Sequence, residues 1–393
     1  MLLADLREIE IVVIGAGIAG LSLAAELASH FSVLVLDLED RLSYHATGRS
    51  AAIFAPSYGD EVVRALSAAS LAFFNEPGVG FAEHPLLRPR GVLQFGSPEQ
   101  SALLDERYDA LRQGGLRVER LAAAAAARVA PVFREGVLGG AIYEPDAADI
   151  DVHGLVSGYV GVLRAAGARL VTGARVMSAE VVGDRWLLQT QAGPLLAGVV
   201  VNAAGAWADD VASLFGVEPV GLAPLRRTVV VVDAPGWPLD ELPFCVALSE
   251  DLYFKPDAGQ LLVSPADETL QAPGDAMPDE MDIAVTIDRL ERATSISVRR
   301  ILASWAGLRT SVSDKGLVIG PDHRYSNFFW LAGQGGYGVQ TAPAAARVAA
   351  NLLGAKPRPG AWSTIDASAF SPSRPTLRNA NRERPPSQGA TQT

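Results

Sequence analysis

The chain has 393 residues, and its 44 acidic and 33 basic side chains give a formal net charge of −11. Hydrophobic residues make up 49% and charged residues 20%, a balance typical of a globular protein long enough for two domains. The acidic balance argues against nucleic acid as a partner, because phosphate binding needs a basic surface. A single cysteine, Cys245, excludes an intramolecular disulfide. No apolar run reaches transmembrane length, so we expect a cytoplasmic protein.

The first forty residues predict a strand, a helix and a second strand. Residues 9–14 are a β-branched run, glycines and an Ala/Leu-rich segment follow, and residues 32–37 are a second apolar run. This order is typical of a βαβ unit in a parallel sheet that is covered on both faces. Helical spacing of apolar residues predicts two further helices, one from residue 62 to just before Pro77 and one over residues 155–166.

From residue 227 onwards the pattern changes to short β runs separated by turn residues. Strands are predicted over 228–232, 244–248, 252–255 and 260–264, and a helix over 281–293. The chain then returns to a buried strand at 328–332 and a helix at 341–353. We therefore expect an α/β protein with a discontinuous Rossmann-like nucleotide domain (residues 1–82, 150–222 and 305–367). A second domain with a mostly antiparallel sheet and helices is expected at 83–149 and 223–304, and a disordered tail at 368–393.

The segment after the first predicted strand reads G-A-G-I-A-G. Gly15 permits the tight turn, Gly17 lets the backbone approach a pyrophosphate, and Gly20 lets the helix pack closely on the strand. The start of the helix supplies free N–H donors for the pyrophosphate. Asp37 ends the second strand, where a carboxylate can accept ribose hydroxyls. The motif predicts a dinucleotide site but does not separate NAD from FAD.

Three further segments indicate the cofactor. The polar loop Y-H-A-T-G-R-S-A-A (44–52), the segment V-N-A-A-G-A-W (201–207) and the turn G-Q-G-G-Y-G (333–338) together resemble the D-amino-acid oxidase superfamily of flavoproteins. The segment S-D-K-G-L-V-I-G-P (313–321) resembles the strand of that family that precedes the flavin ring. Residues 44–59, 81–87, 253–259, 305–309 and 334–341 are most similar to the FAD-dependent D-arginine dehydrogenase type.

The resemblance implies FAD as the cofactor. The residues that it places against FAD are Gly15, Gly17, Ile18, Ala19, Gly20, Asp37, Leu38, Thr47, Gly48, Arg49, Ser50, Ala51, Ala52, Val176, Ala204, Gly205, Gly335, Gly336, Tyr337, Gly338, Val339, Gln340 and Thr341. The turn at 335–336 lacks the cysteine that monomeric sarcosine oxidases use to link FAD, so we expect noncovalent flavin. A covalent link through His45 is the alternative to a hydrogen-bonded loop histidine. The other histidines show no metal-ligand spacing, so no metal is expected.

The resemblance also implies an amino acid substrate held by its carboxylate. A planar guanidinium can pair with both carboxylate oxygens, and the resemblance assigns this task to Arg309 and Arg227, with Arg226 as the competing neighbour of Arg227. Tyr58 and Tyr253 would add phenolic donors. Hydride would leave Cα for the flavin N5, and hydrolysis of the imine would give a 2-oxo acid and ammonia.

Substrate choice is expected to depart from D-arginine. The D-arginine type has a histidine where this chain has Ile53, a threonine at Ala55 and a methionine at Phe244. No acid lies in residues 86–97, where that type places a glutamate for the distal guanidinium. A guanidinium without a partner would be poorly solvated there. With Val246 and Gly336, Ile53 and Phe244 predict a pocket for apolar or broad-range D-amino acids.

The resemblance implies a D-amino acid dehydrogenase that passes electrons to a quinone-type acceptor. One alternative is an oxidase that uses O₂ on D-amino acids or, like sarcosine oxidase, on N-methyl amino acids. An alternative of another class is a flavin-bound assembly subunit without turnover. The co-occurrence of Arg309, Tyr58 and Tyr253 argues against that, because a silent subunit has no need for a carboxylate site.

Overall fold

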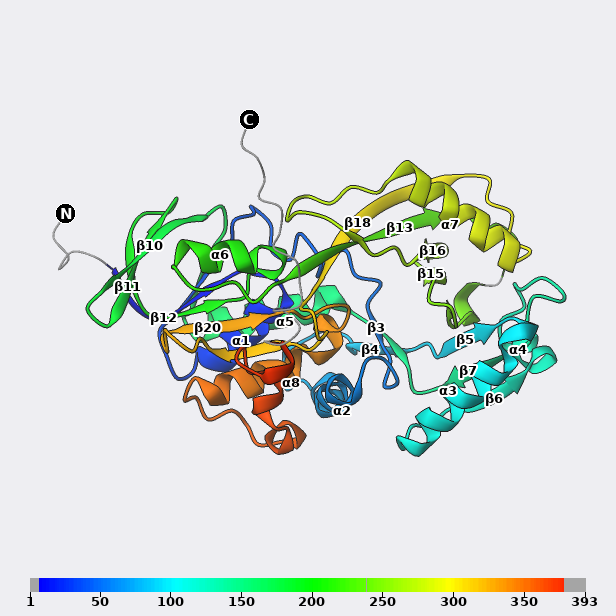
Figure 1. The fold of residues 1–393 in the computed structure, drawn as a ribbon, viewed down its shortest axis with the longest axis horizontal. Coiled ribbons are helices and arrows are strands. Elements are labelled where there is room, and N and C mark those ends of the chain that lie inside the picture. The colour runs from blue at the N-terminus through cyan, green and yellow to red at the C-terminus, as the bar shows by residue number, and fades with distance from the viewer. Residues whose placement is uncertain (1–6, 238, 378–393) are drawn as a thin grey trace.

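The computed structural model describes residues 7–237 and 239–377, which form three sheets with helices packed on them (Figure 1). The first sheet has eight strands and is parallel at its centre, confirming the predicted α/β class with a Rossmann-like domain. Its strands are β10 (Val176–Val182), β11 (Arg185–Thr190), β12 (Leu195–Asn202), β1 (Arg7–Ile14), β2 (Val33–Leu36) and β9 (Arg169–Val171) in that order, with β20 (Phe328–Ala332) on β12 and β19 (Val318–Pro321) on β20.

The second sheet has nine strands and, as expected, is mostly antiparallel; the contact between β14 and β5 is parallel. Its order is β17 (Thr269–Leu270), β13 (Ala223–Val232), β16 (Gln260–Ser264), β15 (Tyr253–Asp257), β14 (Phe244–Ala247), β5 (Val92–Gly96), β7 (Gly140–Glu144) and β6 (Glu119–Ala122), with β18 (Ile301–Ser311) on β13. A small third sheet lies between the two large ones and contains β3 (Ile53–Phe54), β8 (Ala148–Ile150) and β4 (Leu87–Pro89).

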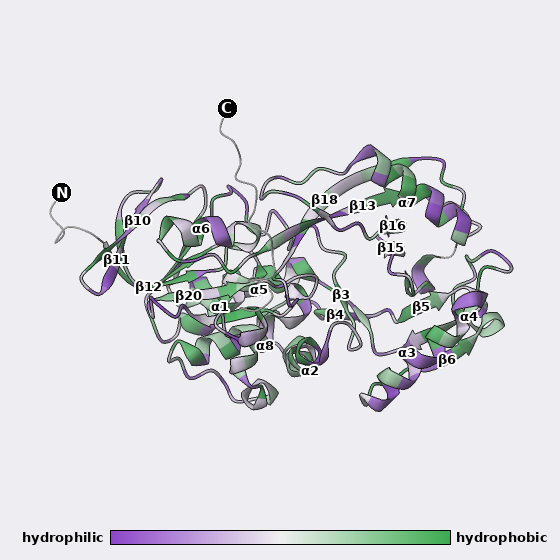
Figure 2. Cartoon of the chain, viewed as in Figure 1, coloured by the Kyte–Doolittle hydropathy of each residue, from purple (hydrophilic) through white to green (hydrophobic). Residues whose placement is uncertain are grey.

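Helices cover the parallel sheet because its strands are apolar on both faces. Strand β2 is buried at all four positions, and one face of the sheet packs against α1 and α8. Helix α2 packs on α8 and α5 on α1. Hydrophobic residues, green in Figure 2, gather on the strands of this sheet and on α1. The helices are α1 (Ile18–Leu27), α2 (Glu61–Asn75), α3 (Ser101–Gln113), α4 (Ala123–Val129), α5 (Val152–Ala165), α6 (Ala208–Leu214), α7 (Glu280–Ala293) and α8 (Gly338–Leu352).

The long pair β13–β18 joins the two large sheets. The two strands pair antiparallel from Ala223↔Ser311 to Val232↔Ile301, and in Figure 1 they run from the parallel sheet into the lobe that contains α7. Strand β18 therefore crosses the domain boundary predicted at residue 304/305. A side chain near residue 309 therefore lies at the junction of the two lobes.

The predicted tail begins too early. Residues 367–370 form a short helical turn, and Phe370 and Leu377 are buried in the two cores of the parallel sheet. Arg374 donates to both carboxylate oxygens of Asp314, each at 2.7 Å, and to the carbonyl oxygen of Leu317 at 2.9 Å. The polar composition concealed these anchors. The rest of the predicted tail, 378–393, lies outside the described residues.

Replacing Arg374 with alanine tests this anchor. The substitution leaves the partly buried Asp314 carboxylate without its ion pair, and the loss of hydrogen bonds between charged groups costs about 1.5–3 kcal/mol. We expect a free energy of unfolding in urea that is lower by that amount. Arg292→Ala, which removes an exposed ion pair with Asp288, is the control and should change it by less than about 0.5 kcal/mol. Equal, small effects would contradict the anchor.

Candidate active site

Four parallel strands end at one edge of the first sheet, and the residues that follow them surround a cavity. Gly15 follows β1, Asp37 follows β2, Ala203 follows β12 and Gly333 follows β20. All four line a cavity of about 620 Å³. Ligands of open parallel sheets bind at this edge, because helix starts and loop ends converge there.

The glycines of the first turn have different physical roles. Gly15 has φ +108°, and a Cβ there would lie 2.4 Å from the carbonyl oxygen of Ala203. A Cβ on Gly20 would lie 1.9 Å from the carbonyl oxygen of Gly15, so this glycine is required for helix–strand packing. Gly17 has an ordinary φ of −76°, and its Cβ would meet only Thr47 Oγ1, at 3.4 Å. The fold therefore does not require glycine at position 17. The absence of a side chain there leaves room for a ligand at the start of α1.

Asp37 lies at the same edge of the sheet and lines the cavity. Its Oδ2 accepts the N–H of Ala16 at 2.6 Å, and its Oδ1 accepts the N–H of Glu39 at 2.8 Å. Burial raises the pKa of Asp37 despite these two hydrogen bonds. The carboxylate is thus held in a fixed orientation in a partly dry site, which suits recognition of ribose hydroxyls.

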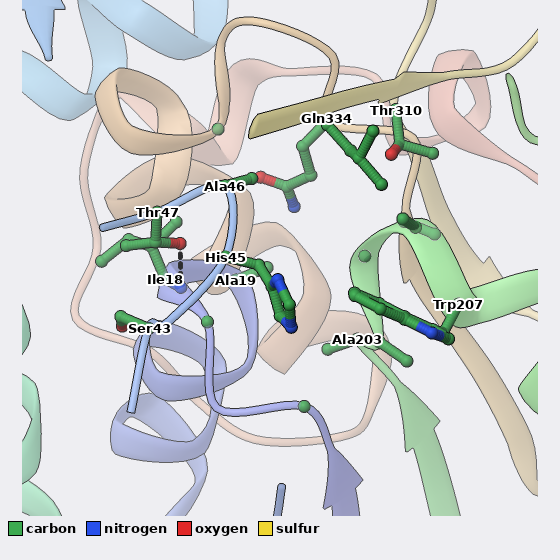
Figure 3. Close-up of a pocket in the computed structure, with 18 of the residues that line it drawn as sticks. Ile18, Ala19, Ser43, His45, Ala46, Thr47, Ala203, Trp207, Thr310 and Gln334 are labelled. Carbon is green, nitrogen blue, oxygen red and sulfur yellow. Dashed lines mark hydrogen bonds between the residues drawn. The ribbon is translucent and has the colours of Figure 1, made fainter. Parts of the chain in front are cut away.

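The loop after β2 closes one side of the cavity. Thr47 Oγ1 accepts the N–H of Ile18 at 3.0 Å, which fixes the loop to the start of α1 (Figure 3). His45 Nε2 lies 2.8 Å from Glu39 Oε1, and its ring lies 4.5 Å from that of Trp207. The predicted hydrogen-bonded role of His45 therefore agrees with its contacts. Arg49 also lines the cavity, but its Nη1 donates to the carbonyl oxygen of Ala306 at 2.8 Å.

Two polar side chains of the cavity lack a partner. The amide nitrogen and oxygen of Gln334 and the hydroxyl of Thr310 are buried and make no hydrogen bond within the described residues (Figure 3). Buried polar groups are nearly always satisfied, and each one left alone costs about 1–3 kcal/mol. These atoms therefore indicate a polar ligand between β18 and the turn after β20.

The predicted carboxylate site lies where β18 meets that turn. Tyr58 Oη and Arg309 Nη1 are 3.1 Å apart, and a Cβ on Gly336 would lie 2.6 Å from the former and 3.0 Å from the latter. Burial lowers the pKa of Arg309, but the oxygens of Tyr58, Tyr253 and Glu268 outweigh it and raise the pKa overall. The guanidinium is therefore a permanent cation in the wall of the cavity.

Of the two neighbouring arginines, Arg227 lines the cavity and Arg226 does not. Arg227 donates to Glu268 Oε1 at 2.9 Å and lies 6.0 Å from the ring centre of Tyr253, which lines the cavity as well. Arg226 donates to Asp282 Oδ2 at 2.6 Å instead. The side chains of adjacent strand residues point to opposite faces, which explains the difference.

An apolar cluster continues from the carboxylate site. Phe244 and Tyr253 stack with ring centres 5.3 Å apart, and the predicted pocket residues pack around them. The cluster contains Ala51, Ile53, Ala55, Tyr58, Val92, Ala147, Val229, Phe244, Val246, Tyr253, Leu262, Ala266 and Trp305. Its members come from the second and third sheets and from loops, including those after β2 and β3.

Most of the predicted cofactor residues line the cavity, but six do not: Gly20, Gly48, Ala52, Tyr337, Gln340 and Thr341. The last three are occupied elsewhere. Tyr337 packs on Tyr58, Gln340 Oε1 accepts the N–H of Ala55, and the N–H of Thr341 donates to Tyr337 because α8 already begins at Gly338. The prediction missed Glu39, Ser43, Trp207, Thr310 and Gln334, although Trp207 and Gln334 lie in segments that carried the resemblance.

Comparison with known proteins gives the family. The model of the family DAO, described as FAD dependent oxidoreductase, matches residues 10–352. FAD-dependent oxidoreductase domain-containing protein 1 of Bos taurus is 29% identical over 197 residues, which are 45% of this chain and 39% of that protein. Monomeric sarcosine oxidase of Bacillus sp. (strain B-0618) is 25% identical over 228 residues, 56% of this chain and 57% of that enzyme. The chain thus spans about two fifths to three fifths of the length of these relatives.

Among solved structures, glycine oxidase from Geobacillus kaustophilus superposes with a TM-score of 0.82 at 21% identity, covering 94% of this chain and 99% of that one. At this identity the likeness concerns the fold. It agrees with the two-lobed arrangement of the sheets described above. In the described part of the chain, none of the helices combines the length and the apolar character needed to cross a membrane.

The cavity fits FAD on grounds of its own. The room above Gly17 at the start of α1 suits a pyrophosphate, and the buried carboxylate of Asp37 suits a ribose. The partnerless amide of Gln334 and the hydroxyl of Thr310 suit the polar edge of a flavin ring. These residues would hold FAD between the strand edge and the carboxylate site.

Replacing Gly17 with alanine tests the cofactor position. The backbone accepts a Cβ at this φ, so we expect an unchanged melting temperature of the apoprotein. A Cβ in the path of the ligand costs roughly 1–3 kcal/mol, so FAD affinity should fall by about tenfold or more in a fluorescence titration. Gly161→Ala, in open space on α5, is the control and should bind FAD as the unmodified chain does. Full FAD affinity of the Gly17 variant would contradict the assignment.

Proposed function

We propose that this chain, a member of the DAO family of FAD-dependent oxidoreductases, deaminates D-amino acids oxidatively to 2-oxo acids and ammonia. One observation carries the proposal. A permanent cation, Arg309, lines the cavity and lies 3.1 Å from the hydroxyl of Tyr58, which belongs to the adjoining apolar cluster and does not itself line the cavity. This arrangement suits a small molecule with a carboxylate at one end and an apolar side chain at the other.

The carboxylate would be bound from two strands. Arg309 on β18 and Arg227 on β13 supply guanidinium donors, and Tyr58 and Tyr253 supply hydroxyl donors. Guanidinium–carboxylate pairs are planar and can be bidentate, so they fix the direction of the substrate as well as its position. Fixing one end in this way limits the orientations of the Cα–H bond.

When bound, FAD supplies the chemistry by accepting the Cα hydrogen with its two electrons as a hydride. The side chains of this chain provide orientation and electrostatics. If the amine binds in its neutral form, its lone pair forms the imine and no residue has to remove a proton from nitrogen. Burial raises the pKa of Tyr337 to about 12, so this neighbour of Tyr58 stays a neutral phenol at physiological pH. The apolar cluster excludes water from the side-chain end.

Apolar or broad-range substrates are favoured over D-arginine. Val92 and Phe244 are each 8% exposed, and both belong to the cluster that contains Ile53 and Val246. An unpaired guanidinium beside these side chains would lose its hydration without compensation. The preference for the D configuration rests on the similarity of residues 44–59, 253–259 and 305–309 to the D-arginine dehydrogenase type. The same similarity favours a quinone-type acceptor.

A second candidate is the oxidation of N-methyl amino acids with O₂. The similarity to monomeric sarcosine oxidase over 228 residues favours it. Both candidates need the same carboxylate site, and they differ in the amine and in the electron acceptor. A flavin-bound assembly subunit would need no such site.

Replacing Arg309 with leucine tests the carboxylate site. Loss of a charge-assisted hydrogen-bond pair is worth roughly 3 kcal/mol, so KM for a reducing amino acid should rise about a hundredfold. The FAD spectrum should be unchanged. Arg226→Leu removes a neighbouring guanidinium outside the cavity and should leave KM within about twofold. An unchanged KM for the Arg309 variant would remove this residue from the site.

Restoring polar groups tests the side-chain pocket. Val92→Glu combined with Ile53→His reintroduces an acid and an imidazole into the apolar cluster. A buried carboxylate pairs with a cationic substrate, so kcat/KM should shift towards D-arginine and D-lysine relative to D-leucine. Val92→Gln with Ile53→His adds polarity without charge and should not favour the cationic substrates. A double variant that keeps the original preference would show that these positions do not contact the side chain.

A further inference from the structure

The loop that carries Tyr58 is held from two sides. At its start, the N–H of Ala55 donates to Gln340 Oε1 of α8 at 3.1 Å. In its middle, Glu144 of β7 accepts twice from Ser57: the backbone N–H at 2.8 Å on Oε1 and the hydroxyl at 2.6 Å on Oε2. The residue that Glu144 holds is the immediate neighbour of Tyr58. One strand of the second sheet thus fixes one half of the proposed carboxylate site.

Glu144 is an unusual residue to find in this place. Glu144 is 3% exposed and lies at the end of β7, opposite Val92 of β5. Within the described residues it has no ion pair, and its two hydrogen-bond donors are both on Ser57. Burial raises the pKa of Glu144 against these hydrogen bonds; Asp146 adds to the rise and Arg107 opposes it. Burying a carboxylate without a cation costs stability, so a reason other than stability is needed for its presence.

The hydroxyl of Tyr58, the residue after Ser57, is closely surrounded. Tyr58 Oη lies 3.1 Å from Arg309 Nη1, and the ring of Tyr58 packs on that of Tyr337 with centres 4.7 Å apart. A Cβ on Gly336 would lie 2.6 Å from Tyr58 Oη, so the hydroxyl has little free space around it. A shift of Ser57 would therefore move the Tyr58 hydroxyl out of its position beside Arg309.

We propose that Glu144 is a positioning residue: by holding Ser57, it sets where the Tyr58 hydroxyl meets Arg309 and so sets the affinity of the site for a substrate carboxylate. This inference rests on the proposed function, since it takes Tyr58 and Arg309 as the carboxylate site. It assigns a role to a side chain that does not line the cavity and that lies on the second sheet. It also explains why a short loop between β3 and α2 can contribute a well-placed hydroxyl.

The test uses the FAD-loaded full chain and benzoate, a carboxylate that cannot be oxidised, as the probe. Benzoate affinity is read from the shift of the visible flavin spectrum. Glu144→Leu removes both acceptors, Glu144→Gln keeps one for the Ser57 N–H, and Ser57→Ala removes only the hydroxyl contact. We expect benzoate affinity to fall about tenfold for the leucine variant and less for the other two. With a reducing amino acid, KM should rise while kcat changes less.

A double-mutant cycle separates positioning from a general structural role. In a Tyr58→Phe background the hydroxyl is absent, so Glu144→Leu should cause no further loss of benzoate affinity. Tyr143→Phe alters the neighbouring side chain on β7 and should leave benzoate affinity unchanged. If the leucine variant does not fold, Glu144→Gln and Ser57→Ala are used in the same cycle.

The results distinguish two failures. If the unmodified chain binds benzoate and the losses from Glu144 and Tyr58 simply add, the positioning role is wrong and the proposed function stands. If the unmodified chain neither binds benzoate nor is reduced by amino acids, the proposed function fails and this inference fails with it. Non-additive losses, largest for the leucine variant, support it.

Discussion

The site depends on the close approach of two strand ends in the parallel sheet. Gly15 after β1 and Ala203 after β12 come so near that a Cβ on Gly15 would lie 2.4 Å from the Ala203 carbonyl oxygen. The start of α1, Asp37 and the turn after β20 lie at the same edge and line the cavity with these two residues. The ligand position follows from the order of the strands, since only ends of adjacent parallel strands can converge in this way.

The second sheet contributes the proposed substrate site next to the edge that suits the dinucleotide. The pair β13–β18 runs from that edge into the other lobe and carries Arg227 and Arg309 at their junction. Strand β7 reaches the same point from the far side through Glu144 and Ser57. The proposed carboxylate site would therefore be built from the second sheet and from the loop after β3. A change that shifts β18 would alter substrate binding through Arg309, and it would also reach the FAD site through Thr310.

The nucleotide half could be predicted because its signals are local. The β-branched strand, the glycine turn and Asp37 lie within forty residues, and each has a conformational or chemical requirement that few other residues meet. The partners of Arg226 and Arg227 could not be predicted, since Asp282 lies on α7 and Glu268 precedes β17, both far from these arginines in the sequence. The contacts of residues 371–377 could not be predicted for the same reason. Arg374 lies in a polar segment typical of a disordered tail, and its partner Asp314 is far away in the sequence.

The most direct test of the central claim is anaerobic reduction of the FAD-loaded chain by paired D- and L-amino acids and by N-methyl amines. Reduction is measured as bleaching of the visible flavin band. The account predicts bleaching by apolar D-amino acids such as D-leucine, with slow recovery when air is readmitted. Rapid recovery of the flavin band with formation of peroxide would indicate an oxidase and not a dehydrogenase. Bleaching by N-methyl amines alone, or by none of the amines, would contradict the proposed substrate class.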